Sequence, residues 1–179
     1  LPGSRKQEIT KMLSVMLSLI KDFSDYQFVI AGAPSQSFDF YKGIIGDKDV
    51  AFVDNKTYDL LSISNAALVT SGTATLETSL FKVPQVVCYK GSTISYQIAK
   101  RIITLKYISL VNLIMDKEVV KELIQNDFTR KSLSQELTKI LDESHREQMF
   151  KDYFKLEQKL GGKGASENVA KSIVKSLKS

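Results

Sequence analysis

The sequence predicts an α/β fold of the Rossmann-like kind, an open and mostly parallel sheet with helices on both faces. Apolar runs such as 27–31 and 85–89 alternate with amphipathic helical patterns through about residue 142. Continuous apolar strands suit a sheet covered on both faces, and strand–helix alternation is typical of right-handed βαβ units. Only helical patterns follow, so we expect one domain, 1–179, with an α/β core at about 1–142 and a helical tail at about 143–179.

The individual elements follow from periodicity and from turn residues. The first residues, Leu1 to Arg5, are typical of a strand's end and its turn, with the strand itself missing. An i, i+3, i+4, i+7 stripe between Ile9 and Ile20 predicts the first helix. We expect strands at 27–31, 50–53, 66–70, 85–89 and 107–111, and helices at about 5–23, 35–44, 56–63, 73–81, 93–104, 117–125, 131–142, 145–160 and 166–178.

Composition narrows the class of protein. The 179 residues are 43% hydrophobic and 25% charged, which is ordinary for a globular domain. The single cysteine, Cys88, allows no disulfide within the chain, and with one histidine, His145, a zinc site is excluded. No apolar stretch reaches the roughly 18–20 residues of a membrane span, and no secretory signal opens the chain, so we expect a cytoplasmic protein.

The basic character of the chain points to anionic partners. A net charge of +5 suits nucleotide phosphates, an acidic membrane surface or nucleic acid. The charges are spread, without a Lys/Arg run interleaved with aromatic residues, which argues against nucleic acid. Lys100, Arg101 and Lys106 give a small basic surface, which in most proteins is simply a solvated face, and contact with anionic lipid is the alternative.

The segment 70–77 has the pattern of a phosphate-binding corner. Strand 66–70 is followed by Ser71, Gly72 and Thr73 and then by a helix. The first N–H groups of a helix have no partner inside it, and the helix dipole there favours an anion. Gly72 allows close backbone approach, while Ser71 and Thr73 add hydroxyl groups. The segment predicts a seat for a phosphate.

Glu77 lies one turn inside that helix, on the face of Thr73. It is not a capping-box acid, because the residue three positions earlier is Ala74. A carboxylate beside a phosphate seat suits a sugar diol, which donates two O–H groups. The local pattern alone fits a first-turn acid stabilised by the helix dipole even better.

A second strand–glycine–helix corner stands at Gly3, Ser4 and Arg5. The guanidinium of Arg5 offers a planar fork for phosphate oxygens, and a cation at a helix N-terminus is unfavourable unless an anion is near. The alternative is a solvated arginine. Asn112, after the expected strand 107–111, either holds a turn or presents its amide to a ligand, and the turn is the more common role.

Ligands of open α/β sheets bind at the carboxyl ends of the strands. The expected strands end at Gly3–Arg5, Val53–Asp54, Ser71–Gly72 and Asn112. Four strand ends with suitable groups together favour a nucleotide-type site, although each one alone is weak.

An ordered set of segments resembles the lipid-A-disaccharide synthase family over residues 1 to about 142. The set consists of Leu1–Arg5 with Glu8-Ile9, 66–68 leading into 71–77, 82–87, 99–101, 107–110 and Asn112-Leu113. Val111 departs from the pattern, because the family usually has proline before the asparagine. The order of the segments makes the resemblance specific.

The resemblance implies the carboxyl-terminal half of a GT-B glycosyltransferase, which holds the UDP-sugar donor. The family transfers 2,3-diacylglucosamine from UDP-2,3-diacylglucosamine to 2,3-diacylglucosamine 1-phosphate with inversion, releasing UDP and the lipid A disaccharide. The amino-terminal half and the first strand would be absent, and with them the catalytic base and most contacts to the lipid acceptor. The implied enzyme needs no cofactor or metal and lies peripherally on the cytoplasmic side of the inner membrane.

The resemblance also assigns roles to residues. It places Gly3, Ser4 and Arg5 at the diphosphate, with Arg5 stabilising the leaving UDP. The remaining expected UDP-sugar contacts are Ser71, Gly72 and Thr73 at phosphate, Glu77 at the ribose hydroxyls, the backbone near Phe52 and Val53 at uracil, and Asn112 near the donor sugar or diphosphate.

Three hypotheses about the function are compatible with the sequence. The first is the donor-binding half just described, inactive alone. The second keeps the fold but changes the reaction to that of a UDP-GlcNAc 2-epimerase or a GlcNAc transferase. The third is a non-enzymatic module that docks on anionic lipid. In related two-half enzymes the last helix crosses to the other half, so its apolar stripe could also drive a homodimer or a domain swap.

Overall fold

The computed structural model describes residues 1–91, 106–161 and 165–177. The helix expected at 93–104, with Lys100 and Arg101, lies outside these residues. The strands are β1 (Val29–Gly32), β2 (Ala51–Asp54), β3 (Ala67–Thr70), β4 (Gln85–Tyr89) and β5 (Lys121–Ile124). The helices are α1 (Lys6–Leu17), α2 (Phe38–Ile45), α3 (Thr57–Ile63), α4 (Ala74–Leu80), α6 (Leu110–Met115), α7 (Arg130–Leu141), α8 (Glu143–Lys159) and α9 (Ala165–Leu177). Two short 3₁₀ turns are Ile20–Asp22 and Gln125–Asp127.

Every strand pairing in the described part of the chain is parallel, which confirms the predicted α/β class. The pairings form two sheets, β1-β2 and β3-β4-β5. Leu1 adds one more parallel contact, because its amino group donates to the Leu68 carbonyl at 3.0 Å and its own carbonyl accepts from the Thr70 N–H at 2.9 Å. Leu1 therefore stands beside β3 where a further strand would end, as its sequence predicts.

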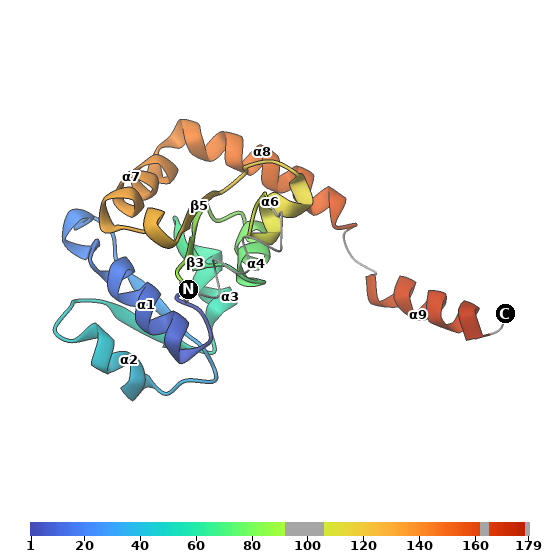
Figure 1. Ribbon diagram of the computed structural model, residues 1–179. Coiled ribbons are helices and arrows are strands. Elements are labelled where there is room, and N and C mark those ends of the chain that lie inside the picture. The colour runs from blue at the N-terminus through green and yellow to red at the C-terminus, as the bar shows by residue number, and fades with distance from the viewer. Residues whose placement is uncertain (92–105, 162–164, 178–179) are drawn as a thin grey trace.

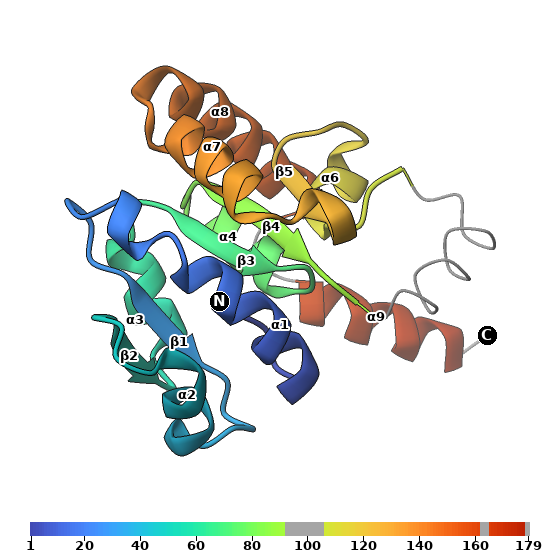
Figure 2. The same ribbon diagram turned by 60° about the vertical axis from the view of Figure 1, so that its left-hand side comes forward.

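Helix α1 packs against both sheets and so joins two hydrophobic cores (Figures 1 and 2). Ile9, Leu13 and Leu17 face the core that contains β1 and α2. Met12 and Met16 face the larger core, which contains β4, α7 and α8. The helix carries apolar residues on two sides, which is why its predicted stripe is broad.

Helices cover the larger sheet on its two faces. α1 and α7 contact one face, and α4 contacts β3 and β4 and also α6 and α8. Figure 2 shows α7 and α8 together above the sheet, with α1 in front of it. This layering matches the continuous apolar sequence of β4, whose residues Val86, Val87 and Cys88 are fully buried.

Two expected elements are wrong. Residues 107–111 do not form a strand, because α6 begins at Leu110 with the Ser109 hydroxyl accepting from the Asn112 N–H. Residues 117–125 do not form a helix, because Lys121–Ile124 pairs with β4 as β5. β5 pairs with β4, and the Glu122 carboxylate accepts hydrogen bonds from backbone N–H groups more than ten positions earlier in the chain. Such long-range interactions cannot be predicted from local periodicity.

The helical tail is confirmed as α8 and α9. α8 packs on the body through Met149, Tyr153 and Leu156. α9 stands apart from the body in Figure 1 and exposes Val169 and Ile173 by more than half of their surface. The dimer or domain swap expected through this stripe stays a prediction. No helix in the described ranges is both long and apolar enough to cross a membrane.

Candidate functional site

The two predicted corners lie against each other at the carboxyl edge of the sheet. Gly3 adopts a φ of +107°, and a Cβ there would lie 3.4 Å from the Thr70 Cγ2 atom. The Thr70 N–H donates to Leu1, as described above. The turn that carries Ser4 and Arg5 is therefore fixed against the strand end that leads into Ser71. The sequence predicts this meeting of corners, and the structure shows it.

Arg5 lies at the mouth of α1 with its side chain 81% exposed. Its Nη1 atom donates to Glu8 Oε1 at 2.8 Å, and its backbone N–H donates to Glu8 Oε2 at 3.4 Å. Glu8 thus holds the guanidinium and also receives an N–H at the helix start. Sequence reasoning gave Glu8 no role, although an acid three residues after a helix cap is the usual signal for one.

The loop after β1 closes one side of the corner. Ser35 Oγ donates to the Ser4 carbonyl at 3.0 Å, and Gln36 Nε2 donates to the same oxygen at 3.4 Å. The Gln36 Oε1 atom is buried and has no hydrogen-bond partner in the described part of the chain. These contacts hold the loop after β1 against the Gly3–Arg5 turn. Ser35 and Gln36 therefore help to position this turn, and the sequence did not predict that role for them.

The corner after β3 offers free donors. Among the described residues, the N–H groups of Thr73 and Ala74 have no acceptor, and a Cβ on Gly72 would meet nothing within 4 Å. The Thr70 hydroxyl is buried and equally without a partner there. The Ser71 hydroxyl instead donates to the Ile108 carbonyl at 3.0 Å. Backbone amides, and not the Ser71 hydroxyl, are thus the donors that this corner presents.

Glu77 lies on α4 and is half-buried. Its Oε1 atom accepts from the Tyr58 hydroxyl at 3.3 Å, and the Tyr58 ring stacks on Phe81 with centroids 5.4 Å apart. The charge of Glu77 and this hydrogen bond raise the pKa of the Tyr58 phenol. Tyr58 thus holds one carboxylate oxygen and leaves the other available. Nothing in the α3 sequence signals this, since the contact joins two different helices.

Asn112 has the more common of the two roles that the sequence predicts, a turn, and not the donor contact that the resemblance implies. The residue is fully buried in α6 instead of ending a strand. Its Oδ1 accepts from Val119 N–H at 2.7 Å and Val120 N–H at 3.0 Å, and its Nδ2 donates at 2.8 Å to the Val120 carbonyl and to Glu122 Oε1. All four of its amide hydrogen bonds are used within the chain. Asn112 therefore holds a turn and does not face the donor, so the expected donor contact is wrong.

Glu122 continues this network toward the site. Its two carboxylate oxygens accept from the N–H groups of Ile108 and Ser109, both at 2.9 Å. Ile108 in turn receives the Ser71 hydroxyl. Through this sequence of bonds Asn112 acts on the corner as a positioning residue.

Phe52 and Val53 lie on β2, away from the two corners in the strand order. The Phe52 ring packs against Gly32, where an added Cβ would come within 2.3 Å of it, and against Phe38 and Tyr41. The ring therefore belongs to the smaller core. The role expected for the Phe52–Val53 backbone at uracil stays a prediction.

The described residues contain neither a cluster of metal-binding side chains nor a reactive thiol. No three His, Cys, Asp or Glu side chains gather there as a metal site requires. Cys88 is buried, and burial raises the pKa of its thiol far above neutral pH. His145 lies exposed in α8 beside Asp142, as the sequence predicts for a solvated residue. That the reaction proceeds without a metal stays a prediction.

A cavity of about 340 Å³ lies elsewhere, beneath Leu1 and Pro2 at the amino ends of β1 and β3. None of the predicted ligand-binding residues lines it. The cavity therefore does not serve the two corners.

The chain is similar to proteins of one family over almost its full length. The family model described as lipid-A-disaccharide synthetase matches residues 1–176, so the similarity continues into the helical tail. A lipid-A-disaccharide synthase of Syntrophus aciditrophicus (strain SB) is 37% identical over 178 residues, 95% of this chain and 46% of that protein.

Two further relatives carry the same name. The one from Geobacter sulfurreducens is 33% identical over 98% of this chain and 48% of its own length. The one from Hahella chejuensis is 37% identical over 98% of this chain and 47% of its own length. The chain thus spans about half the length of the curated relatives it matches.

Proposed function

Because this chain belongs to the lipid-A-disaccharide synthetase family, we propose that it forms the UDP-sugar-binding half of an inverting glycosyltransferase. The donor is UDP-2,3-diacylglucosamine, the acceptor is 2,3-diacylglucosamine 1-phosphate, and the products are the lipid A disaccharide and UDP. The catalytic base and most of the acceptor site belong to the part of the relatives that this chain does not cover. The enzyme works without a metal or cofactor at the cytoplasmic face of the inner membrane, which its net positive charge suits.

The observation that carries the proposal is the contact between the two corners. The Gly3–Arg5 turn packs on Thr70, and the free amides of Thr73 and Ala74 follow on the same strand end. A diphosphate bound there would receive backbone N–H groups from one corner and the Arg5 guanidinium from the other. Negative charge on the departing UDP would be stabilised by these groups.

Glu77 completes the nucleotide site in this proposal. Its free carboxylate oxygen would accept hydroxyl groups of the ribose, while Tyr58 holds the other oxygen in place. Hydrogen bonds to a charged group contribute about 1.5–3 kcal/mol, which corresponds to roughly 10- to 100-fold in affinity.

Calorimetric titration of the chain with UDP and with 2′-deoxy-UDP tests the proposal. We expect saturable UDP binding, and we expect Glu77→Ala to weaken UDP by about tenfold or more while changing 2′-deoxy-UDP much less. Glu118→Ala is the matched control, because Glu118 is an exposed acid paired with Lys121 on the surface. A folded chain without saturable UDP binding contradicts the proposal. Equal losses for both nucleotides would reject the ribose role of Glu77.

A further inference from the structure

The guanidinium of Arg5 is held along one edge only. Its Nη1 atom donates to Glu8 Oε1 at 2.8 Å, and its Nε and Nη2 atoms have no acceptor among the described residues. The side chain of Arg5 is 81% exposed, so a ligand can reach it. The Nε–Nη2 edge has the fork geometry that matches two phosphate oxygens. The ion pair therefore fixes one N–H group of the guanidinium and leaves the phosphate-binding edge free.

Glu8 is the better covered member of the pair. Its side chain is 24% exposed, and its Oε2 atom also accepts from the Arg5 backbone N–H at 3.4 Å. Exposed ion pairs contribute little to the stability of a fold. They do restrict the conformations of a long side chain, and ordering such a side chain is one of the costs of binding a ligand. Glu8 thus orders the Arg5 side chain before an anion arrives.

The side chain of Glu8 also lies directly over the Gly3 turn. A Cβ on Gly3 would come within 3.3 Å of both the Cβ and the Oε2 atom of Glu8. The pattern of a strand, a glycine and a helix predicts that the glycine allows close approach of a ligand. At this corner the Glu8 carboxylate takes that space and complements the dipole of α1. The first corner therefore offers a diphosphate the Arg5 guanidinium, and not its backbone amides.

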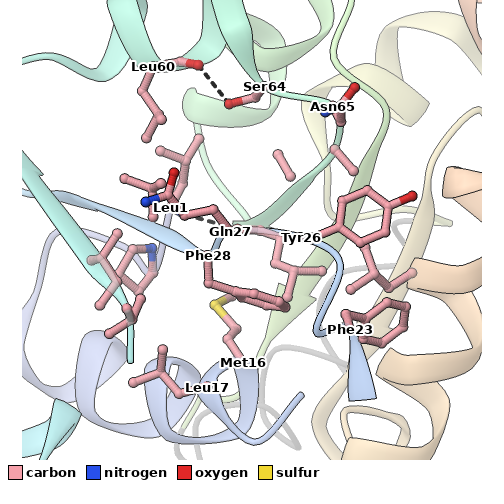
Figure 3. A pocket seen from close by; sticks show the side chains of 18 of the residues that line it. Leu1, Met16, Leu17, Phe23, Tyr26, Gln27, Phe28, Leu60, Ser64 and Asn65 are labelled. Atoms are coloured by element: carbon pink, nitrogen blue, oxygen red, sulfur yellow. Dashed lines mark hydrogen bonds between the residues drawn. The ribbon is translucent and has the colours of Figure 1, made fainter. Parts of the chain in front are cut away.

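Both residues of the ion pair stand on fixed backbone. Ile9 of α1 is fully buried, and Figure 3 shows Met16 and Leu17, at the far end of the same helix, beside the cavity under Leu1. The turn that carries Arg5 follows Leu1, which is hydrogen-bonded to β3. Side chains on rigid elements hold a bound group more precisely than side chains on free loops.

We propose that Glu8 is a positioning residue of the diphosphate site, which holds the Arg5 guanidinium by Nη1 so that its Nε–Nη2 edge is ready for the diphosphate of UDP. This inference rests on the proposed function, because that function supplies the diphosphate. Glu8 does not bind the ligand, since its own charge repels phosphate oxygens. Its effect on UDP passes through Arg5, which separates this role from that of a helix cap.

The variants Glu8→Gln and Glu8→Ala isolate this role. Both remove the negative charge, so any gain from lost repulsion of the phosphates is the same in both. Glutamine keeps a side-chain oxygen that accepts from Arg5 Nη1, and alanine does not. Each substitution is made in the unchanged chain and in the Arg5→Ala chain, where no guanidinium is left to position.

UDP titrations followed by NMR, which also measures weak binding, give the affinities. We expect Glu8→Ala to bind UDP about two- to tenfold more weakly than Glu8→Gln, the range set by ordering one long side chain. In the Arg5→Ala chain the two substitutions should give equal affinities. A capping role would persist there, because residue 5 keeps its backbone N–H. An equal difference between alanine and glutamine in both backgrounds therefore overturns the proposal.

The matched controls are Glu136→Gln and Glu136→Ala. Glu136 forms an ion pair of the same i,i+3 spacing with Lys139 at 2.6 Å, but it lies on α7 and belongs to neither corner. We expect these two variants to bind UDP equally. If they differ as the Glu8 variants do, the Glu8 effect is a general consequence of losing a helix ion pair, and the proposal is overturned.

The unchanged chain separates this inference from the proposed function. A folded chain without saturable UDP binding contradicts both. A chain that binds UDP, with equal affinities for Glu8→Gln and Glu8→Ala, overturns the positioning role of Glu8 alone and leaves the proposed function in place. Circular dichroism of every variant confirms that the compared chains are folded.

Discussion

The enclosed amino group of Leu1 makes the stability of the 179-residue chain depend on pH. In the folded chain the pKa of this group is about 6, against 8.0 in an exposed chain end. The main cause is desolvation, and the electrostatic effect of Cys88 acts in the opposite direction. Its hydrogen bond to the Leu68 carbonyl at 3.0 Å does not replace the lost water.

The direction of the pH dependence follows from the number of protons that the folded and the unfolded chain bind. Between pH 6 and pH 8 the unfolded chain binds a proton at Leu1 and the folded chain does not. The free energy of unfolding therefore rises with pH across this window. Below pH 6 both states are protonated and the full cost of the enclosed charge is present, and above pH 8 it has vanished. Two units at about 1.36 kcal/mol each give a total rise of about 2.7 kcal/mol, of which about 2 kcal/mol falls between pH 6 and pH 8, because each state is half protonated at its own pKa.

Urea denaturation at pH 6, 7 and 8 measures this rise. The chain has no tryptophan, so circular dichroism or tyrosine fluorescence reports unfolding. Domains of this kind are stable by about 5–15 kcal/mol, so a change of about 2 kcal/mol shifts the midpoint clearly.

The matched control is the same chain with an acetylated amino terminus. Acetylation removes the titration of the Leu1 amino group and leaves every side chain of the chain unchanged. We expect the rise between pH 6 and pH 8 to disappear in the acetylated chain. An equal rise in both chains would show that the amino group is not enclosed, and the reasoning about Leu1 would be refuted.

Two further predictions concern the groups around the corners. Asn112→Ala leaves the N–H groups of Val119 and Val120 without their acceptor in the interior. The free energy of unfolding should fall by about 2–4 kcal/mol in urea denaturation, and a fall below about 1 kcal/mol would contradict the role given to the network. Tyr58→Phe keeps the ring that stacks on Phe81 and removes the hydroxyl that holds Glu77. It should weaken UDP severalfold at unchanged stability, and unchanged UDP affinity in calorimetry would show that Glu77 needs no such support.

The corners themselves could be predicted because their signals are local. A buried apolar run, a glycine at the turn and an amphipathic helix appear within a few residues at 66–81. Gly3 and Arg5 repeat the pattern at the start of the chain. The rule that parallel strands align their carboxyl ends then predicts that the corners meet, and the contact between Gly3 and Thr70 confirms it.

The site could not be predicted where side chains act across the fold. Ser71 looks like a phosphate ligand, yet its hydroxyl is taken by the Ile108 carbonyl, 37 positions later in the chain. Asn112 looks like a ligand at a strand end, yet no strand ends there. Both errors have the same cause, since the sequence gives the chemistry of a side chain and not the partner that takes it.

The sequence by itself determined the α/β class, the two glycine-bearing corners and the family, because periodicity, turn chemistry and the order of motifs are properties of the chain. Only the tertiary structure decided that residues 121–124 pair as β5, that Glu122 and Asn112 fix the segment behind Ser71, and that the sheet is divided beside Leu1. The physical reason is that strand pairing and buried hydrogen bonds join residues far apart in the chain. Their free energy depends on which groups remain without a partner once the fold has formed.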